Sequence, residues 1–182
     1  MARKDKQKPR RGAVPLERLR TFGDPALKQQ ANPVTVFDSR LVKLAETMLA
    51  VMHREEGVGL AAPQIGVLSR MIVWHHPEDE NEEYVFVNPR IVSMSEERSL
   101  AGEGCLSVPG CTVEVERANE VRIAAQNLEG VEFEADAAGL IARILQHEID
   151  HLDGRLIVDR AAPEERRRVL KELRERAIES GT

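Results

Sequence analysis

The chain has 182 residues, of which 42% are hydrophobic and 31% are charged, a balance typical of a soluble globular protein with one core. No apolar run is long enough to span a membrane, and two cysteines are too few for a disulfide framework. We therefore expect a single cytoplasmic domain over residues 17–182.

The net charge of −5 is unevenly distributed, because residues 1–12 hold six Lys/Arg and one Asp. This start lacks the apolar segment of a secretory signal. We expect residues 1–16 to form a basic, disordered and solvated arm. Electrostatic attraction to RNA or to a ribosomal surface, and an organelle transit peptide, are alternative interpretations of the same charges.

The remaining chain predicts helices and strands in a mixed order. Asp38 or Ser39 can cap a helix that runs to about Glu55 with its apolar residues on one face, and Gly57 ends it. Period-2 patterning predicts strands over the ranges 71–75, 84–92, 112–117, 120–126 and 131–135. An acidic loop at 77–83 is expected between the first two strands, and a turn at 127–130 between the last two.

From Asp136 onward the apolar residues recur with helical spacing, and Pro163 is suited to begin a last helix that extends to residue 180. The apolar stripe of this last helix favours docking on the domain's own surface over binding a partner. Together these elements predict an α+β fold, with antiparallel or mixed β-sheets around a central helix and a C-terminal helix.

The predicted central helix contains the pattern His147-Glu148-x-x-His151. Positions i and i+4 lie on one helical face, so both imidazoles can bind one metal ion. Glu148 then lies beside the pair, where it could deprotonate a water on that metal. A bare match of this length also arises by chance on polar helices, so the rest of the chain must supply a third ligand.

The third ligand has several candidates. One protease class uses a histidine six residues after the second, but Ile157 occupies that position here and excludes the class. Glu172 is conceivable, although its charged surroundings favour a solvated role. Cys105 would complete a Cys-His-His set with one open position, whereas Cys111 at a strand start is expected to be a buried filler. A thiolate favours Fe(II), Zn(II), Co(II) or Ni(II) over Mg(II).

The segment 57–66, GVGLAAPQIG, is small and apolar, with Gln64 as its single polar side chain. Glycines let a backbone approach a ligand, and an amide can donate to a developing oxyanion. An ordinary buried turn, with Gln64 bonded to backbone groups, is an equally good interpretation of this segment alone.

Three segments resemble the signature motifs of the peptide deformylases, in the family's order and spacing: GVGLAAPQ at 57–64, EGCLS at 103–107 and HEIDH at 147–151. The likeness extends over residues 17–160, including Asn88-Pro89 and the turn at 22–25. It implies that Cys105, His147 and His151 hold the metal, natively Fe(II), and that Glu148 is the general base.

The resemblance also implies roles around the metal. Gln64 and the backbone N–H of Leu106 would donate to the formyl oxygen, and Gly59 would offer backbone hydrogen bonds to an extended substrate peptide. A pocket for the methionine side chain is expected from Val58, Leu140, Ile144 and the ring of His147. Helical geometry independently supports part of this, because residues 140, 144 and 147 share one face.

One departure concerns Arg117, which follows Glu116 where the family often has proline. If it takes the family's arginine position, we expect it to pair with Glu103 or Asp150 behind the metal ligands.

The resemblance predicts a metal-dependent hydrolase that removes the formyl group from N-formylmethionyl nascent peptides near the ribosomal exit tunnel. No membrane and no sequence-specific nucleic acid is expected as a partner. Two alternatives remain open at this point. One is a general metalloprotease that uses a distant carboxylate as third ligand, and the other is a catalytically silent binding protein.

Overall fold

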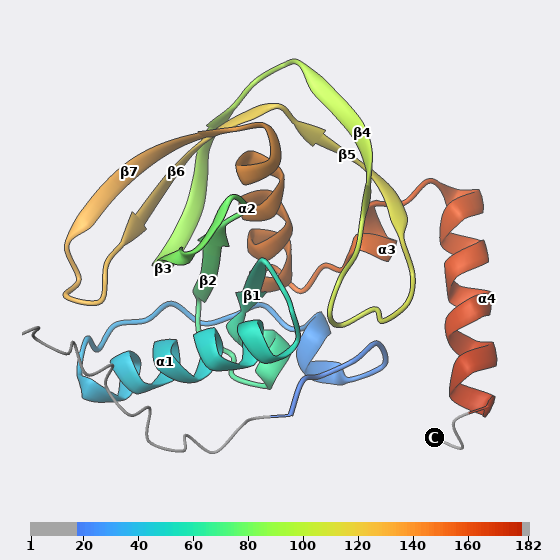
Figure 1. Cartoon of the computed structure of the whole chain (residues 1–182), viewed down its shortest axis with the longest axis horizontal. Helices are drawn as coiled ribbons and strands as arrows, with labels where there is room; N and C mark the ends of the chain where they lie inside the picture. Colours follow the sequence, from blue (N-terminus) through green and yellow to red (C-terminus); the bar gives the residue numbers. More distant parts are fainter. Residues whose placement is uncertain (1–17, 180–182) are drawn as a thin grey trace, which may run out of the picture.

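A computed structural model describes residues 18–179, in which helices and strands follow one another as Figure 1 shows. The expectations for residues 1–17 lie outside this range. The helices are α1 (Ser39–Arg54), α2 (Gly139–Leu152), α3 (Ile157–Arg160) and α4 (Pro163–Glu179), with 3-10 turns η1 (Pro25–Lys28) and η2 (Ala62–Ile65). The strands are β1 (Gly59–Ala61), β2 (Met71–His76), β3 (Asp79–Met94), β4 (Arg98–Glu103), β5 (Val113–Ala118), β6 (Glu120–Gln126) and β7 (Glu132–Ala138).

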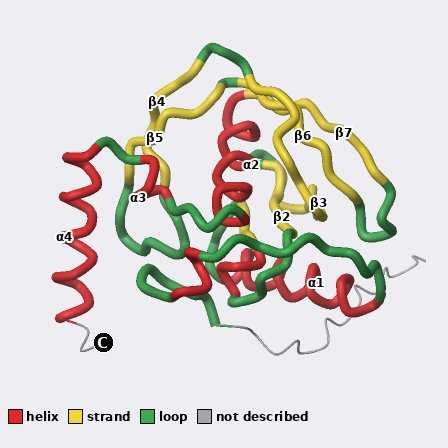
Figure 2. The backbone as a smooth tube through the Cα atoms, turned by 180° about the vertical axis from the view of Figure 1, so that it is seen from behind, coloured by secondary structure: helices red, strands yellow, loops and turns green. Residues whose placement is uncertain are grey.

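Two antiparallel sheets surround the central helix. A five-stranded sheet has the order β1-β2-β3-β6-β7, and β4 and β5 form a separate two-stranded sheet. Figure 1 shows α2 between the two sheets, with α1 below and α4 at the far side of β4 and β5, and Figure 2 shows the same arrangement from behind. The predicted α+β fold with a central helix and a C-terminal helix is confirmed.

Three apolar clusters hold these layers together. The inner face of α2 packs on the large sheet through residues that include Ile144, Leu145, Ile149, Trp74 and Phe86. The predicted apolar face of α1 packs on β1 and β2 in a second cluster. Burial of side chains of this size stabilises the fold by roughly 1.5–3 kcal/mol each.

The third cluster joins α4 to β5 and to the loop before it. Val169 is fully buried there, and Leu173 packs against its edge. This arrangement matches the expected docking of the last helix on the domain itself. Ile178, near the end of α4, is 80% exposed and does not belong to this cluster.

The start of α2 is set by the strand before it. The helix begins at Gly139, three residues later than expected, because β7 pairs with β6 as far as Ala138 opposite Glu120. Gly139 has a φ of +57°, a conformation that glycine adopts without steric cost, and its N–H donates to Asn119 O. The chain thus turns sharply from sheet edge into the helix that carries the histidines.

The prediction of an acidic loop at 77–83 is wrong. Only Pro77 and Glu78 form the turn, and β3 begins at Asp79 with His75 opposite Glu83. Charged residues are tolerated in strand here because residues 79–83 of β3 are all exposed. Within residues 18–179 no helix has the length and apolar character needed to cross a membrane.

Candidate metal centre

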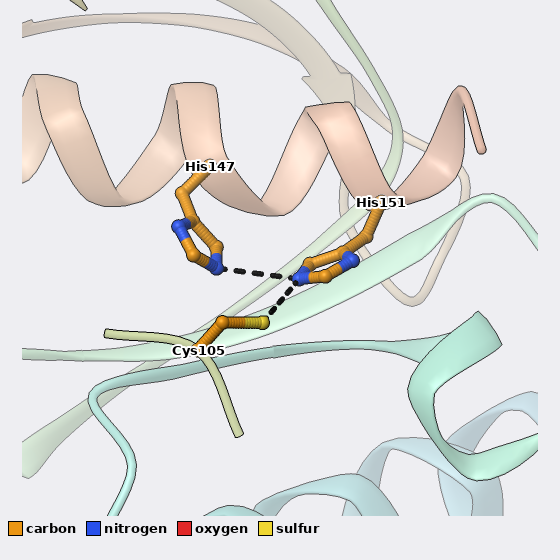
Figure 3. Close-up of side chains that lie close together, drawn as sticks. All are labelled: Cys105, His147 and His151. Carbon is orange, nitrogen blue, oxygen red and sulfur yellow. Dashed lines mark hydrogen bonds between the residues drawn. The ribbon is translucent and has the colours of Figure 1, made fainter. Parts of the chain in front are cut away.

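The thiol and the two imidazoles predicted as ligands converge on one point, as Figure 3 shows. His147 and His151 extend from the same face of α2, and Cys105 approaches from the loop after β4. The distance from Cys105 Sγ to His151 Nε2 is 3.3 Å, and the two Nε2 atoms lie 3.2 Å apart. A tetrahedral site with bonds of about 2.0 Å to nitrogen and 2.3 Å to sulfur separates its ligand atoms by roughly 3.3–3.6 Å. The three groups therefore fit one metal ion.

The other candidate ligands lie elsewhere. Cys111 is buried, as expected of a filler, with its sulfur 3.9 Å from Glu172 Oε2. Glu172 itself accepts a hydrogen bond from Arg168 on the surface of α4. Within the described part of the chain, the grouping of metal-binding side chains therefore consists of Cys105 and the two histidines of α2.

The protonation of the histidines depends on their surroundings. Burial lowers the pKa of His151 well below its usual value, which favours the neutral imidazole that binds metal. Burial also lowers the pKa of His147, but hydrogen bonds with Cys105 and Glu103 outweigh it and raise this pKa above the usual range. A proton and a metal ion therefore compete for His147.

Glu148 is buried beside the two histidines. Its Oε2 atom has no hydrogen-bond partner among residues 18–179, and burial raises the pKa of the carboxyl to about 7. A Cβ added at Gly59 would lie 2.6 Å from Glu148 Oε1, so any larger residue here would displace the carboxylate or β1. An unpartnered buried carboxylate is costly, and a water molecule in the groove would be a suitable partner.

Gln64 has a fixed orientation beside the thiol. Its Oε1 accepts the N–H of Ala61 at 2.8 Å, which leaves the amide nitrogen to point the other way. That nitrogen donates to Ser107 Oγ at 3.2 Å and lies 3.9 Å from Cys105 Sγ. The donor group of Gln64 thus faces the metal centre. Ser107 lies in the segment EGCLS at 103–107, but no feature of the sequence predicted its contact with Gln64.

A groove of about 740 Å³ joins these groups. Its lining includes nearly all of the residues singled out in the sequence, namely Val58, Gly59, Gln64, Cys105, Leu106, Leu140, Ile144, His147 and Glu148. His151 is 1% exposed and lies beneath the groove. Val58 and Leu140 are 44% and 57% exposed at its surface, whereas Ile144 is buried.

A buried charge network lies behind the ligands. Arg117 donates to both oxygens of Glu103 at 2.9 and 3.0 Å and also to Asp150, so the expected pairing is confirmed with both partners. Glu103 in turn contacts His147 Nδ1 at 2.9 Å, which leaves Nε2 directed at the other ligands. Burial alone would raise the pKa of Glu103, but hydrogen bonds from His147 and Arg117 lower it to about 2.

The sequence did not identify two further arginines of this network. Arg160 binds Asp150, and Arg143 binds Glu103 at 2.8 Å. In each pair the arginine and the carboxylate lie on different elements, α3 and α2 for Arg160 and α2 and β4 for Arg143. The sequence around an arginine in a helix does not indicate such a contact.

The fold and this site define a metal-dependent hydrolase, with two histidines of one helix, a cysteine thiol and a buried carboxylate in a single groove. The family model of polypeptide deformylase matches residues 16–167, so the chain belongs to this family.

Individual relatives agree with this assignment. A peptide deformylase of Natranaerobius thermophilus is 49% identical over 146 residues, covering 80% of this chain and 92% of that protein. The crystal structure of a peptide deformylase from Legionella pneumophila is similar with a TM-score of 0.84 and 40% identity, covering 91% of this chain and 98% of that one. A plant peptide deformylase reaches a TM-score of 0.85 at 34% identity, with 94% and 96% covered.

Proposed function

We propose that this chain hydrolyses the formyl amide at the N-terminus of N-formylmethionyl peptides and releases formate. Membership of the polypeptide deformylase family supports the reaction. The observation that carries it is the buried carboxylate of Glu148, whose Oε2 has no hydrogen-bond partner within residues 18–179, beside a Cys-His-His centre in an open groove. Such a carboxylate is suited to hold and deprotonate an attacking water.

Cys105, His147 and His151 would hold the metal ion. A thiolate ligand favours a soft or borderline divalent metal, so we propose Fe(II) as the native ion, with Zn(II), Ni(II) or Co(II) as substitutes. When bound here, the metal supplies a Lewis acid that polarises the carbonyl and acidifies water.

Glu148 acts as the general base and then as the acid. It takes a proton from the water whose oxygen adds to the formyl carbon, and it returns the proton to the methionine nitrogen as the C–N bond breaks. A pKa of about 7 lets one group do both at neutral pH, because neither the ionised nor the protonated form is strongly disfavoured. The products are formate and the free amine of the peptide.

The formyl oxygen gains negative charge when water adds. Gln64 donates its amide hydrogen to this oxygen, because the N–H of Ala61 holds the Gln64 side chain in the required orientation. We assign a second donor to the backbone N–H of Leu106, which directly follows the ligand Cys105 in the groove lining. Fixed donors of this kind typically contribute a factor of about 10²–10³ to the rate.

The groove next to the metal binds the peptide. Backbone groups of Gly59 at the start of β1 pair with an extended substrate, and Val58, Leu140 and Ile144 receive the methionine side chain. We further propose nascent chains as the natural substrates, the ribosome near its exit tunnel as the place of action, and the cytoplasm as the compartment.

The deciding experiment compares wild-type protein, purified without oxygen and loaded with Fe(II), with its Glu148→Ala variant. Formate released from formyl-Met-Ala-Ser by the wild type and almost none by the variant is the expected result. If the metal-loaded wild type releases no formate, the proposed enzymatic function is wrong and the alternative of a catalytically silent binding protein is favoured. Cleavage of internal peptide bonds would instead favour the general protease.

A further inference from the structure

The hairpin of β4 and β5 forms one wall of the groove, yet β4 contributes little to the core. Among the described strands β4 pairs only with β5, and of its six residues only Glu103 is buried. The end of this strand, at Gly102 and Glu103, lines the groove opposite residues of α2. β5 is held by apolar packing through Val113 and Val115, whereas β4 has few apolar contacts, so the position of β4 relative to α2 depends largely on polar contacts.

Arg143 supplies four of these polar contacts from one side chain, and Gln146, His147 and Asp150 of the same helix supply the others. It lies on α2 one turn before His147 and also lines the groove, with its side chain 12% exposed. Nη1 donates to Glu103 Oε1 and to the carbonyl of Val115, both at 2.8 Å. Nη2 donates to the carbonyl and the hydroxyl of Ser99 at 2.8 and 3.1 Å. One guanidinium therefore joins both strands of the hairpin to the helix.

This set of contacts depends on the shape of arginine. The acceptors lie on three residues of two strands, and the planar fork reaches all of them with its two terminal nitrogens. The single ammonium of lysine keeps the charge but cannot span acceptors that are this far apart. The contacts are also distinct from those of Arg117, which binds Glu103 from β5 and does not line the groove.

We propose that Arg143 is a positioning residue for substrate selection, which fixes the β4–β5 hairpin against α2 and thereby sets the width of the groove between them. The proposal rests on the proposed function, in which the first side chain of the substrate lies beside Leu140 and Ile144 on this helix. When the contact is lost, β4 moves relative to α2 and the groove no longer matches the long, unbranched methionine. The ratio of kcat/KM for methionine over alanine peptides then falls, and peptides with an aromatic first residue are accepted.

Arg143→Met and Arg143→Lys test the proposal, with Arg122→Met as the matched control. Arg122 also makes a two-point contact, with Asp136, but on the exposed surface of β6 and β7 away from the groove. Metal content and melting temperature are measured for every variant. Values of kcat/KM are then compared for tripeptides that differ only in the first residue: formyl-Met-, formyl-Ala- and formyl-Phe-Ala-Ser.

Both Arg143 variants are expected to bind the metal at wild-type stoichiometry. Their ratio of kcat/KM for the methionine over the alanine peptide should fall about tenfold, the scale of losing close contact with one or two methylene groups. Most of this loss should be in KM, and the phenylalanine peptide should gain relative to methionine. Arg122→Met should keep the wild-type ratios.

Two results would overturn the proposal. One is an unchanged methionine-to-alanine ratio in Arg143→Met, even if all rates fall together. The other is loss of the metal from both Arg143 variants, since the arginine would then act on His147 through Glu103.

Binding measurements separate this proposal from the proposed function. Dissociation constants of the same formyl peptides are measured by calorimetry on Glu148→Ala protein, with and without Arg143→Met. The ratio of dissociation constants for the alanine and methionine peptides needs no turnover, so it tests the role of Arg143 even if the wild type releases no formate. A wild type that releases no formate would refute the proposed function alone.

Discussion

Arg117 is the side chain on which the buried charges of this protein most depend. It is 3% exposed and donates to Glu103 and to Asp150, which are each 5% exposed. Replacement by methionine keeps an unbranched apolar stem but removes the guanidinium, which leaves two buried carboxylates short of a cation. Breaking a buried pair in this way costs about 3–5 kcal/mol.

The structure places the expected loss at the lower end of this range. Glu103 keeps the hydrogen bond from Arg143, and Asp150 keeps Arg160, so neither carboxylate is left without a cation. A loss of about 3 kcal/mol in a domain of this size lowers the melting temperature by roughly 6–12 °C. Glu103 also orients His147, so we expect the metal affinity to fall about 10–100-fold.

The assay is calorimetric unfolding of chelator-treated Arg117→Met, together with metal affinity measured by competition with a chromogenic chelator. Arg117→Lys should lie between the variant and the wild type, because one ammonium cannot serve both carboxylates. A melting temperature within about 2 °C of the wild type, with unchanged metal affinity, would refute the account of this network.

Three further predictions concern the site itself. Cys105→Ala should lose the metal while the fold remains, and elemental analysis that finds the metal retained would favour a distant carboxylate as third ligand. Gly59→Ala should keep the metal but lose most of its kcat/KM for formyl-Met-Ala-Ser, because the new methyl group would lie 2.6 Å from Glu148 Oε1; a variant with wild-type activity would show that β1 can move away. Burial raises the pKa of Glu148 to about 7, and a general base must be ionised. We therefore expect kcat/KM to rise with pH between about 5 and 8. The midpoint should lie at or below about 7, because the bound cation lowers the pKa of Glu148. A flat profile over this range would contradict the role of Glu148 as base.

The parts of the fold that could be predicted from sequence have local causes. Asp38 accepts the N–H of Arg40 at 2.8 Å and begins α1 where a capping residue was expected. β6 begins and ends at the expected residues, Glu120 and Gln126, because Val121, Ile123 and Ala125 form one buried face and alternate with more exposed residues. The positions of His147 and His151 on one face of α2 follow from helical spacing alone.

The parts that could not be predicted depend on contacts between distant segments. The sequence of β4, RSLAGE, has no apolar alternation, and its strand conformation comes from pairing with β5. No strand was predicted at β1, within the segment 57–66, for a similar reason, since only its pairing with Trp74 and its neighbours in β2 makes it a strand. Local propensity is weak in both segments, so the partner strand decides.

The metal centre shows how one short motif and one helix fit each other. Glu103 contacts His147, and Cys105, two residues later, contacts His151, one helical turn later. Two residues of extended chain advance about 6.6 Å and one turn of helix advances about 5.4 Å, so the two spacings nearly match. The segment can therefore run alongside α2 and place a carboxylate behind one histidine and a thiol beside the other. This match gives a physical reason why a glutamate precedes the cysteine by two positions in a protein whose histidines are four apart.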